Sequence, residues 1–164
     1  MLRIVGIHSS KKYEEYLKNI SRIKANMKCG ILNGATYPDG LSVATVAYIN
    51  ENGEMGNPRR PFMHRTLEEN QEKWAKGIVN NLTGNVSAAS VQRAYEFAGM
   101  TAKGDMVETI KKWSPNDPRA NSPATIARKA AKGRKGKNTV ATDPTQVLID
   151  TGTMISSIDY EVET

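Results

Sequence analysis

Residues 147–162 read Val-Leu-Ile-Asp-Thr-Gly-Thr-Met-Ile-Ser-Ser-Ile-Asp-Tyr-Glu-Val, and this stretch decides the fold of the C-terminal part. Asp150, Thr151 and Gly152 predict a structural turn, and Met154 and Ile155 a short apolar helical turn. A strand from Ser157 to Glu163 should then close the chain. Its apolar residues alternate with acidic ones, so we expect one face of this strand to be packed and the other to be wet.

Asp-Thr-Gly also has an enzymatic interpretation, because aspartic proteases present a catalytic carboxylate in this motif after an apolar run. A homodimeric protease brings two such loops together so that the carboxylates share a proton. It also needs a flap and a substrate groove built largely from the chain that follows, and twelve residues follow Gly152. We favour the turn, which Asp150 or Thr151 can cap and in which we expect Asp150 to be the capping carboxylate. A protease that uses Asp150 is kept as an alternative.

Composition limits the other classes of function. The 164 residues predict a single domain, 1–164, that can bury roughly 70% of its unfolded surface. No apolar run approaches the roughly 20 residues of a membrane helix, and the N-terminus lacks a signal-peptide pattern, so we expect synthesis in the cytoplasm. Cys29 is the single cysteine, and His8 and His64 are the two histidines. We therefore expect no internal disulfide, no Cys/His zinc site and no cofactor.

Apolar periodicity predicts an α+β fold, with a small mixed or antiparallel sheet packed against one N-terminal helix and two long central helices, and with extended loops. We expect an N-terminal helix from Ser9 or Ser10 to Met27, and central helices over residues 62–82 and 87–113. The second and third strands should form a hairpin around the turn Tyr37-Pro-Asp-Gly40. The four expected strands are Leu2–His8, Lys28–Ala35, Leu41–Asn50 and Ser157–Glu163.

The segment from Asn50 to Met63 is irregular, because Pro58 and Pro61 hold two arginines between them in extended conformation. One interpretation is a rigid connector with Phe62 as a core residue. The other is that Arg59 and Arg60 grip phosphates or carboxylates. A stiff exposed loop is also suited to binding a partner.

A basic region follows the central helices. Ser122-Pro123 predicts the start of a short basic helix over residues 124–132, and a flexible basic loop should extend over about residues 133–147. With a net charge of +6, the chain could bind nucleic acid without sequence preference. A solvated loop is the alternative. The possible DNA-phosphate contacts are Arg128, Lys129, Lys132, Arg134, Lys135 and Lys137.

The ordered set of motifs resembles the tail-completion or neck proteins of tailed bacteriophages, also described as minor tail components or virion morphogenesis proteins. The resemblance covers residues 31–162. The segments that carry it are Tyr37-Pro-Asp-Gly40, Val43-Ala-Thr-Val-Ala-Tyr-Ile-Asn-Glu-Asn-Gly53, Arg60-Pro-Phe-Met63, Ser122-Pro-Ala-Thr-Ile-Ala-Arg-Lys129 and Leu148-Ile-Asp-Thr-Gly152 with the strand ending at Val162.

The resemblance implies a non-enzymatic virion protein of the neck or tail region, assembled in the host cytoplasm. Such a protein would join a DNA-filled head to a tail as a homo-oligomeric ring, about a hexamer, through head-to-tail contacts. Its partners would be head-side connector or adaptor proteins, tail tube or tail terminator proteins, and DNA in the lumen. A basic nucleic-acid-binding protein is the alternative. The expected inter-subunit or partner contacts are Asn57, Arg59, Arg60, Phe62 and Arg119.

Overall fold

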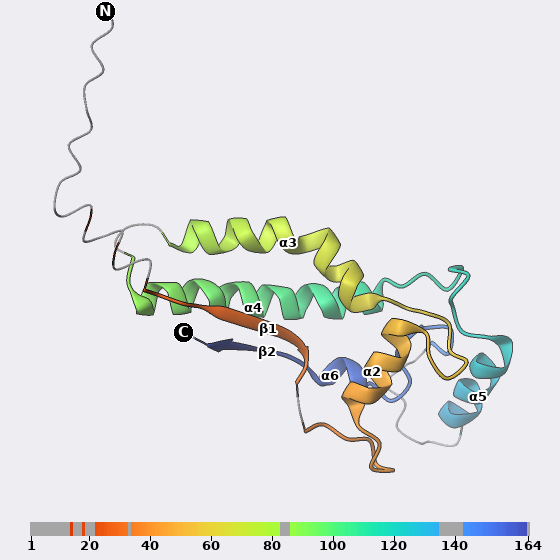
Figure 1. The fold of residues 1–164 in the computed structure, drawn as a ribbon. Coiled ribbons are helices and arrows are strands. Elements are labelled where there is room, and N and C mark those ends of the chain that lie inside the picture. Colours follow the sequence, from red (N-terminus) through yellow and green to blue (C-terminus); the bar gives the residue numbers. More distant parts are fainter. Residues whose placement is uncertain are drawn as a thin grey trace, which may run out of the picture.

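A computed structural model describes residues 14, 18, 22–32, 34–82, 86–134 and 143–163. The element order is β1 (Asn26–Ile31), α2 (Val43–Asn52), α3 (Phe62–Asn81), α4 (Ala88–Lys111), α5 (Pro123–Arg134), α6 (Thr153–Ser156) and β2 (Ile158–Glu163). The fold is α+β, as predicted. Helices α3 and α4 lie side by side, and the two strands pack along α4 (Figure 1). In the described part of the chain, no helix is both long and apolar enough to cross a membrane.

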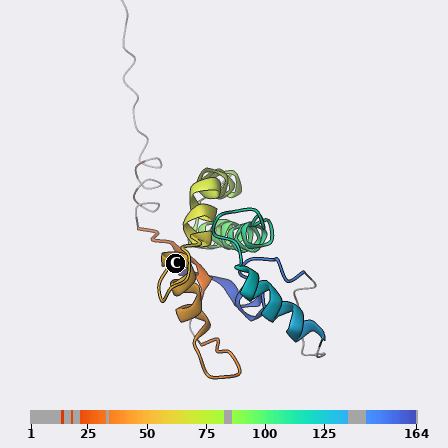
Figure 2. The ribbon, with the colours of Figure 1, turned by 90° about the vertical axis from the view of Figure 1, so that its right-hand side faces the viewer.

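Residues 34–61, 113–134 and 143–157, which include α2, α5 and α6, gather at one end of the long helices, and we call them the end lobe (Figures 1 and 2). Neighbouring parts of this lobe are far apart in the sequence. Hydrogen bonds between these distant segments therefore determine the positions of its loops.

The sheet contains two antiparallel strands among the described residues, with Asn26 opposite Glu163 and Ile31 opposite Ile158. Along β2, Ile158, Tyr160 and Val162 are more buried than the acidic residues between them. This confirms the closing strand and its alternation. The hairpin predicted for residues 28–50 is wrong, because β1 pairs with the end of the chain instead.

The predicted strand Leu41–Asn50 is helix α2. The hydroxyl oxygen of Ser42 accepts a hydrogen bond from the backbone N–H of Thr45 at 3.4 Å, which caps the start of the helix. The fully buried Val43 and Ala47 are four residues apart and therefore lie on one helical face. β-branched residues in this run favoured a strand, but the cap and the packing of this face outweigh that preference. The turn at residues 37–40 is present, with Gly40 N–H donating to Tyr37 O at 2.9 Å.

The predicted N-terminal helix does not extend to Met27, which lies in β1. The apolar residues keep a helical spacing of three and four up to Met27, which is why a helix was predicted there. In the structure β1 begins at Asn26, its residues alternate in burial, and it packs against α4. Of the preceding part of this helix, Glu14 and Lys18 are described and are helical. The predicted strand Leu2–His8 lies outside the described residues.

The two long helices begin and end close to the predicted positions. Ser87 caps α4 in a capping box with Ser90, and the indole N–H of Trp74 in α3 donates to Oδ2 of Asp105 in α4 at 2.7 Å. Small side chains allow close packing along α4. At Gly99, an added Cβ would lie 2.3 Å from Cδ2 of Tyr160, so β2 approaches the helix backbone at this point.

The main core cluster lies where the end lobe meets the long helices and the sheet. Phe62, Ile110 and Ile158 are almost completely buried in it and come from α3, α4 and β2. Cys29 packs against this cluster, and burial raises the pKa of its thiol to about 11. A thiol with so high a pKa holds its proton at neutral pH, so Cys29 acts as a small apolar residue.

Candidate functional site

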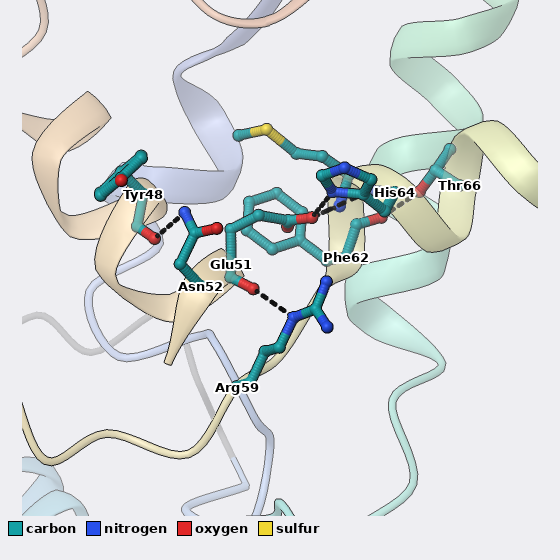
Figure 3. A network of polar contacts seen from close by, with 8 residues as sticks. Tyr48, Glu51, Asn52, Arg59, Phe62, His64 and Thr66 are labelled. Atoms are coloured by element: carbon teal, nitrogen blue, oxygen red, sulfur yellow. Dashed lines mark hydrogen bonds and ion pairs between the residues drawn. The ribbon is translucent and has the colours of Figure 1, made fainter. Parts of the chain in front are cut away.

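Glu51, which is 5% exposed, holds the loop between α2 and α3 through its carboxylate. One carboxylate oxygen accepts from the backbone N–H of Met63 at 2.9 Å, and the other accepts from the N–H of His64 at 3.0 Å. These are N–H groups of the first turn of α3, which lack acceptors within the helix. Nδ1 of His64 lies 2.5 Å from the same carboxylate (Figure 3). Glu51 therefore caps α3 from a neighbouring helix.

The two arginines of this loop differ in their environments. Arg59 is exposed, and its Nε donates to the carbonyl oxygen of Glu51 at 3.4 Å (Figure 3). Arg60 is 8% exposed, and its guanidinium group donates to the carbonyl oxygens of Arg119 at 2.6 Å and Ala120 at 3.2 Å. A third bond, of 3.1 Å, reaches Oδ1 of Asn50. Burial lowers the pKa of Arg60. Arg60 thus ties the loop before α3 to the loop after α4.

A second buried cation organises the other side of the end lobe. Lys129 in α5 is 8% exposed, and its Nζ donates to the carbonyl oxygens of Gln146 at 2.7 Å and Ile149 at 2.6 Å. Desolvation lowers its pKa, and nearby cations act in the same direction while Asp150 opposes them. Lys129 therefore fixes the segment before α6 against α5.

The turn before α6 has the predicted location but a different capping group. Gly152 adopts φ +81°, and the hydroxyl oxygen of Thr151 accepts from the backbone N–H of Thr153 at 3.3 Å. The prediction of Asp150 as the cap is wrong, because its Oδ2 lies 2.6 Å from Nζ of Lys132. In an aspartic protease a second carboxylate would face this group. Here an ammonium group does.

Arg119 is positioned by an aromatic ring and a carboxylate. Its guanidinium carbon lies 5.2 Å from the centroid of the Trp113 ring, a distance typical of a cation–π contact, and Arg65 lies 5.6 Å from the same centroid. Asp117 accepts two side-chain bonds of 2.9 Å from Arg119, which lower the pKa of this carboxyl group to about 2. Arg119 is half-buried, and its contacts with Asp117 and Trp113 fix the orientation of its guanidinium group at the surface.

The expected partner contacts therefore divide into surface and interior residues. Asn57 and Arg59 are exposed, whereas Arg60 is buried and Phe62 is fully buried in the core. Phe62 and Arg60 can shape a contact surface only by positioning other residues. Exposure depends on tertiary packing, which the sequence pattern around the two prolines did not reveal.

The expected phosphate contacts divide in the same way. Arg128 is exposed on α5, Lys129 is buried against carbonyl groups, and Lys132 is paired with Asp150. The α5 helix includes Arg134, but its side chain lies outside the described part, as do Lys135 and Lys137. In the part that is described, α5 does not present a continuous row of free cations.

Met55 is an exposed apolar residue that the sequence pattern did not single out. Its side chain is 83% exposed at the tip of the loop between α2 and α3, and its φ is +54°. Burying an apolar side chain of this size at an interface stabilises association. The signal in the sequence was an apolar residue between Gly53-Glu54 and Gly56 in a polar loop.

A polar cavity of about 670 Å³ lies within the end lobe, between the turn at residues 37–41, α2, α5 and the segment before α6. Arg60, Lys129 and Lys132 line it together with Arg128, and the carboxylates that line it are Asp39 and Asp150. The structure thus brings together residues from the two predicted sites, the loop before α3 and the basic helix.

Replacing Arg60 or Lys129 by Met should destabilise the fold by about 2 kcal/mol each, because two loop carbonyl groups lose their donors in a part-buried setting. Arg59→Met is the matched control. It removes one long bond from an exposed residue, and we expect less than about 0.5 kcal/mol. Urea unfolding of the three variants measures the difference. Equal losses for Arg59→Met and Arg60→Met would contradict these roles.

The fold and site describe an α+β protein in which buried charged side chains hold loops by their backbone groups. Among the residues described, no group of His, Cys, Asp and Glu side chains has the arrangement of a metal site. Comparisons of the chain with models of protein families, with curated proteins and with solved structures gave no match.

Proposed function

We propose that this chain is a non-enzymatic structural subunit of the neck of a tailed bacteriophage. It would assemble into a ring of about six copies that completes or terminates the tail and joins it to the DNA-filled head. Its partners would be head-side connector or adaptor proteins and tail tube or tail terminator proteins, with DNA passing through the lumen. The ordered motifs between residues 31 and 162 support this class.

The observation that carries the proposal is an exposed apolar residue on a loop that is held in place. Met55 is exposed, while Glu51 and Arg60 attach the two ends of its loop to α3 and to the loop after α4. A loop with a fixed backbone loses little conformational entropy on binding. Such a loop is suited to a permanent contact with another subunit.

A ring with head-to-tail contacts needs two different surfaces on each copy. Met55 belongs to the end lobe, and further exposed apolar side chains lie on the long helices at Val79, Phe97 and Met100. A cavity of about 660 Å³ between α3 and α4 is lined by Trp74, Gly77 and Phe97, among others. The end lobe and the helix pair therefore offer distinct surfaces for successive subunits.

Met55→Asn should abolish ring formation without affecting the monomer fold. Asn tolerates the left-handed backbone at this position, and an 83% exposed side chain contributes little to the core. We expect rings of the unmodified chain in negative-stain images and monomers of the variant in light scattering. Tyr48→Ser, at a 57% exposed position of α2, is the control for replacing an exposed apolar surface by a polar one. Rings that persist in Met55→Asn would contradict this role of the loop.

A further inference from the structure

The cavity of the end lobe contains two buried cations without a carboxylate partner. Arg60 and Lys129 both line it, and their hydrogen bonds go to backbone carbonyl groups and to the side-chain amide of Asn50. Neither forms an ion pair with a residue that the structure describes. Carbonyl oxygens satisfy the donors of a cation but do not neutralise its charge, so the cost of burying these charges is only partly offset.

The charge of the cavity lining as a whole is positive. Arg60, Arg128, Lys129 and Lys132 line it, and Asp39 and Asp150 are the carboxylates among the lining residues. Asp150 is already paired with Lys132, and Asp39 is exposed. Burial is the largest cause that lowers the pKa of Lys129; Asp150 opposes it, and Arg60, Arg128 and Lys132 lower the pKa further. An anionic group in the cavity would therefore meet Arg60, Arg128 and Lys129, for which the described residues provide no ion pair.

The shape and the remaining lining select the kind of anion. Arg60 and Lys129 are each 8% exposed, so a DNA backbone passing over the surface would not reach both cations. A glutamate or aspartate side chain can enter such a space. Apolar side chains also line the cavity, among them Leu41, Val46 and Met154, and Leu41 is 47% exposed. A peptide in which an acidic residue stands beside an apolar one matches both the buried cations and the apolar part of the lining.

We propose that this cavity is the docking site for an acidic peptide segment of a partner protein, which inserts a carboxylate between Arg60, Lys129 and the rim residue Arg128. Insertion would supply the missing counter-charge and bury the apolar neighbour against Leu41. The anion site rests on the geometry of the end lobe. Its assignment to a neighbouring subunit of the neck rests on the proposed function.

The test is an NMR titration of the full chain with a short peptide that has two glutamates flanked by leucines. A peptide with glutamines in place of the glutamates is the matched control. We expect the glutamate peptide to shift the amide signals of residues around Lys129 and Asp150, and the glutamine peptide to leave them unchanged. Arg128→Glu should weaken binding at least about tenfold, because it reverses an exposed charge at the rim.

Arg93→Glu provides the control for net charge, because Arg93 is exposed on α4 and does not line the cavity. It should change the dissociation constant less than about twofold. Equal weakening in both variants, or none in Arg128→Glu, would overturn the proposal. Stronger shifts of the same residues with inorganic phosphate or duplex DNA would assign the cavity to phosphates instead. Shifts that depend on protein concentration without peptide would assign it to a second copy.

The outcome is separate from that of the ring experiment. Peptide binding by a chain that forms no rings would retain the acidic-peptide site and remove the proposed neck function. Rings without peptide binding would retain the function and remove the site.

Discussion

Gly99→Ala is expected to destabilise the fold by about 3 kcal/mol, although alanine usually stabilises a helix interior. The added Cβ would lie 2.3 Å from Cδ2 and 2.8 Å from Cγ of Tyr160. Cγ is close to the backbone of β2, so the ring cannot simply swing away at its far end. Either the Tyr160 side chain leaves its position or the sheet moves from α4. Thermal or urea unfolding measures the loss.

Gly104→Ala is the matched control in the same helix, since no atom lies within 4 Å of an added Cβ there. We expect it to stabilise the fold by about 0.5–1 kcal/mol through helix propensity. In a Tyr160→Ala background, Gly99→Ala should also become stabilising, because the obstructing ring is absent. A loss at position 99 that persists without the Tyr160 ring would show that the close approach is not its cause.

Glu51→Leu is expected to destabilise the fold by about 3 kcal/mol, because two part-buried N–H groups at the start of α3 lose their acceptor. Glu51→Gln should cost about half as much, since one amide oxygen can still accept a bond. Chemical denaturation measures both losses. Amide hydrogen exchange at Met63 and His64 should quicken in Glu51→Leu.

Glu68→Leu is the control for this substitution, because Glu68 is exposed on α3 and has no ion pair among the described residues. We expect a change within about 0.5 kcal/mol. A similar loss in both variants would mean that the effect comes from removing a negative charge near α3 and not from losing the cap.

The parts of the fold that follow from local pattern could be predicted from the sequence. Helices α3 and α4 have long periodic runs, Ser87 marks the start of α4, and β2 alternates along its length. α2 could not be predicted in this way, since its β-branched residues also suit a strand. Its cap, Ser42, comes just after the turn at residues 37–40, where a hairpin strand would also begin. The bounds and the pairing predicted for β1 were wrong, because its partner is the last strand of the chain and not the adjacent segment.

The candidate site was predictable only as a set of segments. Pattern alone identified the loop around Arg59 and the basic helix around Arg128 as surface features. It did not distinguish Arg59 from Arg60, because the burial of Arg60 depends on carbonyl groups nearly sixty positions away. It also missed Glu51, whose role depends on where α3 begins relative to α2. Polar contacts between distant segments determine these roles, and local composition does not encode them.

The pairing of β1 with β2 also constrains the order in which the chain can fold. Lys28 and Glu163, which form an ion pair across the sheet, are 135 positions apart. During synthesis, β1 has no partner strand until the residues of β2 emerge, whereas α3 and α4 are neighbours in sequence and can pack much sooner. Until β2 is synthesised, the side chains of β1 can therefore be covered only by packing on the α3–α4 pair. Before that pair forms, they remain exposed to solvent.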